Sequence, residues 1–141
     1  MLKSWHNLKV EKRRKKLADR LSETITTIER ELDALIKLNE LMEEFAIDMA
    51  KLGCDELVDD LTNYIASNKM VVENSEFFVH NLRESYMTGE AISNFSDFRE
   101  RIRILVQLSE HVQGYRKTAE KAFDFYKTSK DFVVSMYARR Q

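Results

Sequence analysis

The stretch LSETITTIERELDALIKLNELMEEFAIDMAKL, residues 21–52, decides the fold. Its apolar side chains recur at alternating intervals of three and four residues, which places them along one seam of a long coiled-coil helix. The seam positions are Leu21, Ile25, Ile28, Leu32, Leu35, Asn39, Met42, Ala46 and Met49. Leu38, Leu41 and Phe45 widen this seam, so we expect more than one neighbouring helix to pack on it.

Part of the same seam is predicted to hold chains together. The predicted oligomer interface consists of Ile25, Ile28, Leu32, Leu35, Asn39 and Met42. Asn39 has two interpretations. It is either a buried amide that sets the register of a parallel dimer, or a side chain that faces solvent or caps an irregularity in a wide three-helix core.

Signals on either side of the seam predict where the helices end. The first helix runs from about Ser4 to Leu52 and is about 70 Å long at 1.5 Å per residue. Gly53 then supplies a C-terminal stop, and Asp55 is expected to be the N-cap of the next helix. Because this connection is very short, the two helices are expected to form an antiparallel hairpin.

Two further apolar stripes follow, one from Leu57 to Tyr86 and one from Phe98 almost to the end of the chain. Residues 88–90 separate them weakly, so they form either two helices or one kinked rod. We predict two. The expected fold class is therefore all-α, an elongated antiparallel three-helix bundle or coiled coil, with residues 17–141 as a single domain.

Composition supports this fold class and narrows the setting. The 141 residues include no proline and three glycines, too few turn-forming residues for sheet-rich folds. No apolar run of about 18 residues is present, so no membrane span is expected. The single cysteine, Cys54, cannot form an intramolecular disulfide, which favours a reducing, cytoplasmic setting.

The net charge of −1 conceals a strong asymmetry. Residues 1–20 hold eight basic and two acidic side chains, a net charge of +6, while residues 40–60 hold eight acidic side chains and one basic. Residues 1–16 are therefore predicted to be a basic amphipathic segment that continues into the first helix and binds an anionic phospholipid membrane peripherally. The predicted membrane-binding residues are Leu2, Trp5, Lys9, Lys12, Arg13, Arg14, Lys15, Lys16 and Arg20.

Three other interpretations of this basic segment stay open. It is also typical of a solvated helix face without a partner, of a nuclear-localisation or nucleic-acid patch, and of a calmodulin-type target. Trp5 is the only aromatic residue close to it, so an interleaved set of base-stacking side chains is missing, and nucleic acid is not an expected partner.

The sequence gives no reason to propose an enzyme. His6, His80 and His111 lie far apart, and none forms a ligand pair at helical spacing. No glycine-rich phosphate loop and no nucleophile elbow is present. We therefore expect no catalytic residues, no metal site, no cofactor and no small-molecule substrate.

Residues 45–53, FAIDMAKLG, resemble the end of the first BAR helix of sorting nexins, where a Phe-Ala-x-x-Leu/Met-Ala-x-Leu-Gly run precedes the turn. Downstream, the family's second-helix pattern of a Phe pair, a Tyr and an Ala-Ile/Val-x-x-x-Phe-x-x-Arg stretch is similar to the following residues. They are Phe77, Phe78, Leu82, Tyr86, Ala91, Ile92, Phe98 and Arg101. The resemblance covers about residues 20–101. It implies a crescent-shaped homo- or heterodimer on curved, anionic, endosomal membrane.

These observations predict a non-enzymatic, BAR-like dimeric module that binds anionic membrane and associates with itself or with a related helical protein. The alternative is a soluble coiled-coil adaptor that holds protein partners along its helical faces.

Overall fold

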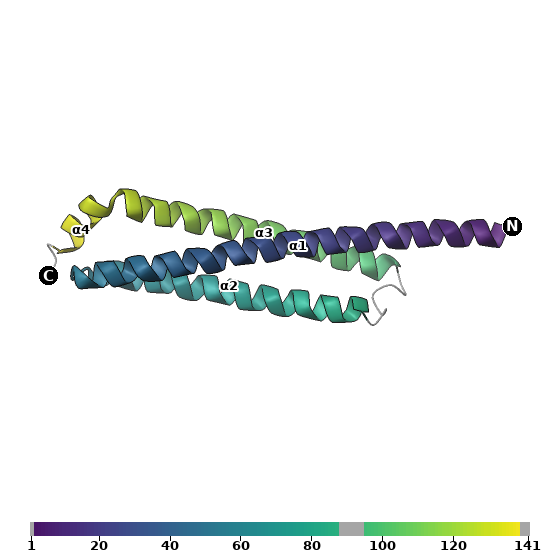
Figure 1. Ribbon diagram of the computed structural model, residues 1–141, viewed down its shortest axis with the longest axis horizontal. Coiled ribbons are helices and arrows are strands. Elements are labelled where there is room, and N and C mark those ends of the chain that lie inside the picture. Colours follow the sequence, from purple (N-terminus) through teal and green to yellow (C-terminus); the bar gives the residue numbers. More distant parts are fainter. Residues whose placement is uncertain (1, 88–94, 139–141) are drawn as a thin grey trace.

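The chain forms an elongated helical bundle in the computed structural model, which describes residues 2–87 and 95–138 (Figure 1). The described residues form α1 (Leu2–Lys51), α2 (Asp55–Met87), α3 (Phe95–Thr128) and the short α4 (Lys130–Ala138), with no strand among them. Helix α2 runs antiparallel to α1, and α3 runs antiparallel to α2. The predicted all-α, elongated antiparallel three-helix bundle is confirmed.

The turn between α1 and α2 forms at Gly53, as the sequence predicts. Gly53 has a φ of 77°, in the left-handed region that glycine enters without a Cβ penalty. The Met49 carbonyl accepts hydrogen bonds from the backbone N–H groups of Leu52 and Cys54 at 3.1 and 3.0 Å, which closes the end of α1. The expected N-cap is displaced by one residue, because α2 already begins at Asp55 and the Cys54 carbonyl accepts its first bond, from Val58.

Helix α1 is the central element of the bundle. It packs along both α2 and α3, whereas α2 and α3 scarcely contact each other. The widened seam explains this arrangement in part, because Leu38 and Phe45 are buried beside the main seam residues. Leu41, also predicted to widen the seam, is instead 51% exposed, so that prediction is wrong.

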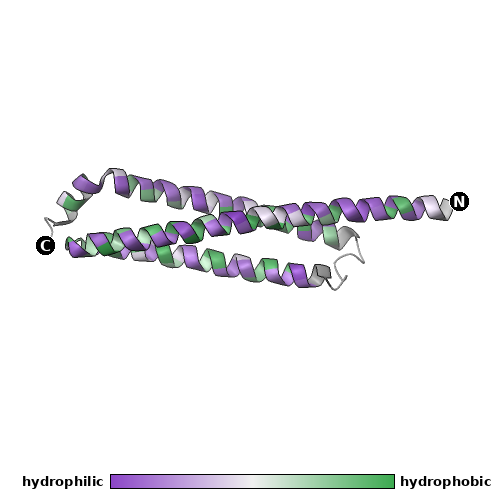
Figure 2. Cartoon of the chain, viewed as in Figure 1, coloured by the Kyte–Doolittle hydropathy of each residue, from purple (hydrophilic) through white to green (hydrophobic). Residues whose placement is uncertain are grey.

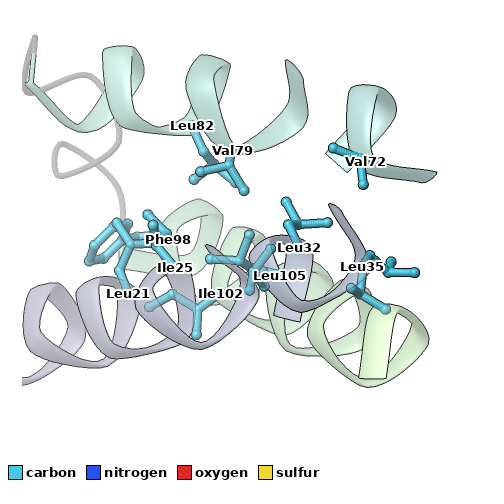
Figure 3. Close-up of a cluster of buried hydrophobic side chains, with 12 residues drawn as sticks. Leu21, Ile25, Leu32, Leu35, Val72, Val79, Leu82, Phe98, Ile102 and Leu105 are labelled. Carbon is cyan, nitrogen blue, oxygen red and sulfur yellow. The ribbon is translucent and has the colours of Figure 1, made fainter. Parts of the chain in front are cut away.

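The core consists of two apolar clusters along α1. The first joins the middle of α1 to the distal part of α2 and the start of α3, with Leu21, Leu82 and Phe98 at its end (Figure 3). The second lies toward the α1–α2 turn and includes Met49, Leu57 and Phe123. Burying each such side chain contributes about 1.5–3 kcal/mol, so these two clusters are the main source of stability.

The six residues predicted as an oligomer interface lie inside this core. Their exposed fractions are 5% or less, because α2 and α3 of the same chain cover them. The prediction is therefore wrong for the chain folded in this way, since the seam holds one chain together and presents no face to a second copy. The residues that belong to the core of the single chain, instead of to an oligomer interface, are Ile25, Ile28, Leu32, Leu35, Asn39 and Met42.

Asn39 is buried and pairs within its own chain, so neither the parallel-dimer nor the solvent-facing interpretation holds. Its Oδ1 accepts a hydrogen bond of 2.7 Å from Nδ2 of Asn68 on α2, and its own Nδ2 donates to the Ile65 carbonyl at 3.4 Å. Asn68 is fully buried and its Oδ1 has no hydrogen-bond partner. This asparagine pair therefore fixes the register of α2 on α1 at the cost of one unsatisfied carbonyl.

A second polar contact joins α1 to α3. Arg116 occupies a seam position of α3 and forms ion pairs with Glu31 of α1 and, at 2.8 Å, with Glu120. The side chains of Arg116 and Glu31 are only 19% and 15% exposed. Hydrogen bonding to Glu31 and then to Glu120 raises the pKa of the Arg116 guanidinium above its ordinary value, which secures its charge at this largely buried site.

The second and third apolar stripes form two separate helices rather than one kinked rod, because α2 and α3 pack on α1 in opposite directions. The connection that was expected to separate them falls in residues 88–94, outside the described residues. A break that the sequence did not predict ends α3 at Thr128. The Thr128 hydroxyl donates to the Asp124 carbonyl at 2.8 Å, and α4 begins after Ser129.

Candidate membrane-binding surface

The first part of α1 projects beyond the rest of the bundle as a single helix (Figure 1). We call residues 2–16 the overhang. The apolar seam fades there, since its positions are occupied by Leu17, Arg14, Val10, Asn7 and Lys3 in turn toward the N-terminus. Leu17 is the last of these to pack against the core. With charged and amide side chains on its seam, the overhang offers α2 and α3 nothing to bury.

Polar side chains dominate the overhang, as the hydropathy colouring indicates (Figure 2). From residue 4 to residue 16 every side chain is exposed except that of Val10, which is half-buried. Trp5 and Leu8 are 61% and 58% exposed. The described side chains of the basic tip are therefore open to solvent.

Helical geometry gathers five of the predicted residues on one side of α1. At 100° per residue they span about 80° of the helix circumference, on the side that faces away from the core seam. We call this set the basic stripe: Trp5, Lys9, Lys12, Lys16 and Arg20. All five side chains are exposed, and Nζ of Lys9 lies 4.4 Å from the centroid of the Trp5 ring.

The other predicted residues are placed differently. Arg13 borders the basic stripe, whereas Arg14 lies on the seam side of α1 and Lys15 lies about 100° from the centre of the stripe. The side chain of Leu2 lies outside the described residues. Among the described side chains, Trp5 is the apolar member of the stripe, so this side of the overhang presents basic groups together with one aromatic residue.

The charges at the two ends of the molecule are opposite in sign. The eight acidic residues between positions 40 and 60 surround the α1–α2 turn, at the far end of α1 from the basic stripe. Since about 10 Å of salt solution screens a charge, the acidic end has little influence on the overhang. An anionic surface is therefore attracted to one end of the rod and repelled from the other.

Groups with catalytic or metal-binding chemistry are scattered. Among residues 2–87 and 95–138, no group of three His, Cys, Asp or Glu side chains is arranged to hold a metal ion. Cys54 is fully buried beside the α1–α2 turn. His6 lies on the overhang, His80 pairs with Glu84 at 3.2 Å on α2, and His111 contacts the Tyr115 ring on α3.

Two features of the structure escaped the sequence analysis. Asn68 follows Leu61 and Ile65 at seam spacing, so its position in the apolar stripe was a signal that it is buried. The outer face of α2 presents Met70 and Phe77 at 64% and 69% exposure. Their seven-residue spacing was visible in the sequence, but only the packing shows that they lie away from α1.

Comparisons with protein-family models, with curated proteins and with solved structures found no match to this chain. Within the described parts of the four helices, no segment combines the length and apolar character needed to cross a bilayer.

Proposed function

We propose that this chain is a non-enzymatic helical module that attaches to anionic membrane through the basic stripe on the N-terminal part of α1. The observation that carries the proposal is the alignment of Lys9, Lys12, Lys16 and Arg20 with Trp5 on one exposed side of a projecting helix. Basic side chains near an anionic leaflet contribute about 1 kcal/mol each, and tryptophan favours the headgroup region. The resemblance to sorting-nexin BAR helices points in the same direction and suggests an endosomal membrane.

The shape of the chain supports peripheral rather than deep attachment. Because the basic stripe faces away from the core seam, the overhang can lie along a bilayer without disturbing the packing of α2 and α3. Four cations then approach lipid headgroups over a length of about 17 Å, at 1.5 Å per residue between Lys9 and Arg20. Among the described side chains, Trp5 is the large apolar residue on this side that can enter the interface.

Vesicle co-sedimentation tests the proposal. The vesicles contain phosphatidylcholine with about 30% phosphatidylserine, and binding is compared at low and high salt. Replacing the four bases of the stripe with Gln removes about 4 kcal/mol of attraction, so the partition coefficient is expected to fall about 1,000-fold. Binding of the unmodified chain is expected to decrease as salt rises.

A matched control separates location from net charge. Gln at four exposed bundle lysines removes the same charge away from the overhang, and this variant is expected to pellet almost as well as the unmodified chain. The control positions are Lys37, Lys51, Lys127 and Lys130. Failure of the unmodified chain to pellet at low salt, or equal losses in both variants, would contradict the proposal and leave the soluble adaptor as the remaining interpretation.

A further inference from the structure

The outer face of α2 is a strip without charge in a chain of which 33% is charged. At 100° per residue the strip runs along the side of α2 opposite α1, and all its side chains are exposed. Its members are Asn63, Ser67, Met70, Asn74, Phe77 and Asn81. Met70 and Phe77 stand in the middle of it, flanked by amides and a hydroxyl. Absence of charge together with exposed aromatic and Met side chains is typical of the centre of a protein interface.

This strip adjoins a groove between α2 and α3. The groove exists because both helices pack on α1 but scarcely on each other. It contains two hollows, of about 290 and 540 Å³. Apolar and neutral groups line most of it, chiefly Tyr64, Val71 and Phe78 of α2 and Ile104, Leu108 and Tyr115 of α3.

We propose that a second copy of this chain docks on this surface, with α2 packed antiparallel to α2 of the partner about a twofold axis near Asn74. Such an axis places Met70 of each copy opposite Phe77 of the other. A surface that carries amides is complementary to itself, because each amide both donates and accepts hydrogen bonds. A twofold interface requires that kind of self-complementarity.

The available area is sufficient for a specific dimer. The strip from Asn63 to Asn81 is about 27 Å long, and α2 with the groove and α3 is about 20 Å wide. Two such faces bury roughly 1,100 Å² in total, just above the approximately 1,000 Å² of a specific interface. The proposal is independent of membrane attachment, because dimerisation is measured without lipid.

Sedimentation velocity with light scattering tests the proposal on the full chain. The unmodified chain, of 16.7 kDa, is expected to show twice this mass at micromolar to tens of micromolar concentration. Replacing Met70 and Phe77 with Gln is expected to weaken association at least about 100-fold. Both side chains are exposed, so the variant is expected to keep the helical circular dichroism of the parent chain.

The matched control replaces two exposed apolar residues of α1 with Gln. These are Leu41 and Ile47, which are 51% and 56% exposed, and the change is expected to leave the dimer intact. A monomeric parent chain at about 100 µM, or equal dissociation of the control variant, would overturn the proposal.

A cysteine cross-link tests the axis itself. Asn74→Cys is expected to form a disulfide-linked dimer under mild oxidation, since its two copies meet at the axis, while buried Cys54 does not react. Lys37→Cys, exposed on α1, is expected to stay largely monomeric under the same conditions. Equal cross-linking at both positions would refute the α2 interface.

Discussion

The buried asparagine pair gives the sharpest quantitative test of the packing. Leu at position 39, at position 68 and at both positions forms a double-mutant cycle across the α1–α2 contact. The two single changes are not equivalent. Asn39→Leu leaves both polar atoms of the fully buried Asn68 side chain without an oxygen or nitrogen partner, with only the Met42 sulfur 3.9 Å from Nδ2. Asn68→Leu leaves Asn39 Oδ1 without a donor but also removes the carbonyl that is already unsatisfied.

The expected magnitudes follow from these partners. An unsatisfied buried amide group costs about 1–3 kcal/mol, so Asn39→Leu is expected to lower the free energy of unfolding by that amount. Asn68→Leu is expected to be less harmful. The double variant buries two Leu side chains and leaves no unpaired side-chain polar atom at positions 39 and 68. It is therefore expected to be more stable than the parent chain. The coupling energy is expected to be about 1–3 kcal/mol.

Thermal and guanidinium unfolding followed by circular dichroism measure these differences. Each 1 kcal/mol shifts the midpoint of a chain of this size by roughly 3 °C, which is readily resolved. Additive effects of the two single substitutions would refute the hydrogen-bonded pair. Asn68→Leu proving more destabilising than Asn39→Leu would refute the assignment of the unsatisfied carbonyl to Asn68.

Further predictions concern other parts of the bundle. Arg116→Met leaves Glu31 largely buried without its cation and is expected to lower the free energy of unfolding by about 2–3 kcal/mol in guanidinium titrations, whereas adding Glu31→Met recovers most of the loss. Gly53→Ala places a Cβ at a φ of 77° and is expected to cost about 1–2 kcal/mol; no loss would show that the turn relaxes. Burial, with smaller contributions from Asp60 and Tyr64, raises the pKa of Tyr126 above its ordinary value of 10.0. The partly buried neutral phenol of Tyr126 therefore stabilises the fold fully below pH 10, and this stabilisation is lost as the pH rises through the folded-state pKa. Tyr126→Phe is expected to flatten the alkaline fall in melting temperature.

Much of the fold follows from local patterns in the sequence. The heptad spacing of α1 and the glycine at the turn are short-range signals, and they predicted the long helix and the position where it ends. Which helix covers the seam is a long-range property. Met42 and Leu35 show the same spacing whether α2 of the same chain or a second chain covers them. The sequence analysis therefore placed these residues in an oligomer interface. The short α1–α2 turn instead folds α2 of the same chain onto them.

The candidate surface was predicted in its composition but not in its geometry. The excess of basic residues in the sequence identified residues 1–20 as the candidate surface. Only the continuous helix α1 shows that Lys12 and Lys16 lie on the stripe and that Lys15 does not. The neutral face of α2 could not be recognised in advance, because Phe77 at a seven-residue interval from Met70 also fits a core position. Its exposure depends on which side of α2 meets α1.

Fluorescence of Trp5, the single tryptophan of the chain, tests the central claim most directly. Because Trp5 lies on the basic stripe and is 61% exposed, its emission reports on this surface without any label. Addition of phosphatidylserine-containing vesicles at low salt is expected to shift the emission to the blue and to protect it from an aqueous quencher, while phosphatidylcholine vesicles leave it unchanged. Emission that stays solvent-like and freely quenched at a large excess of anionic lipid would contradict attachment through the overhang.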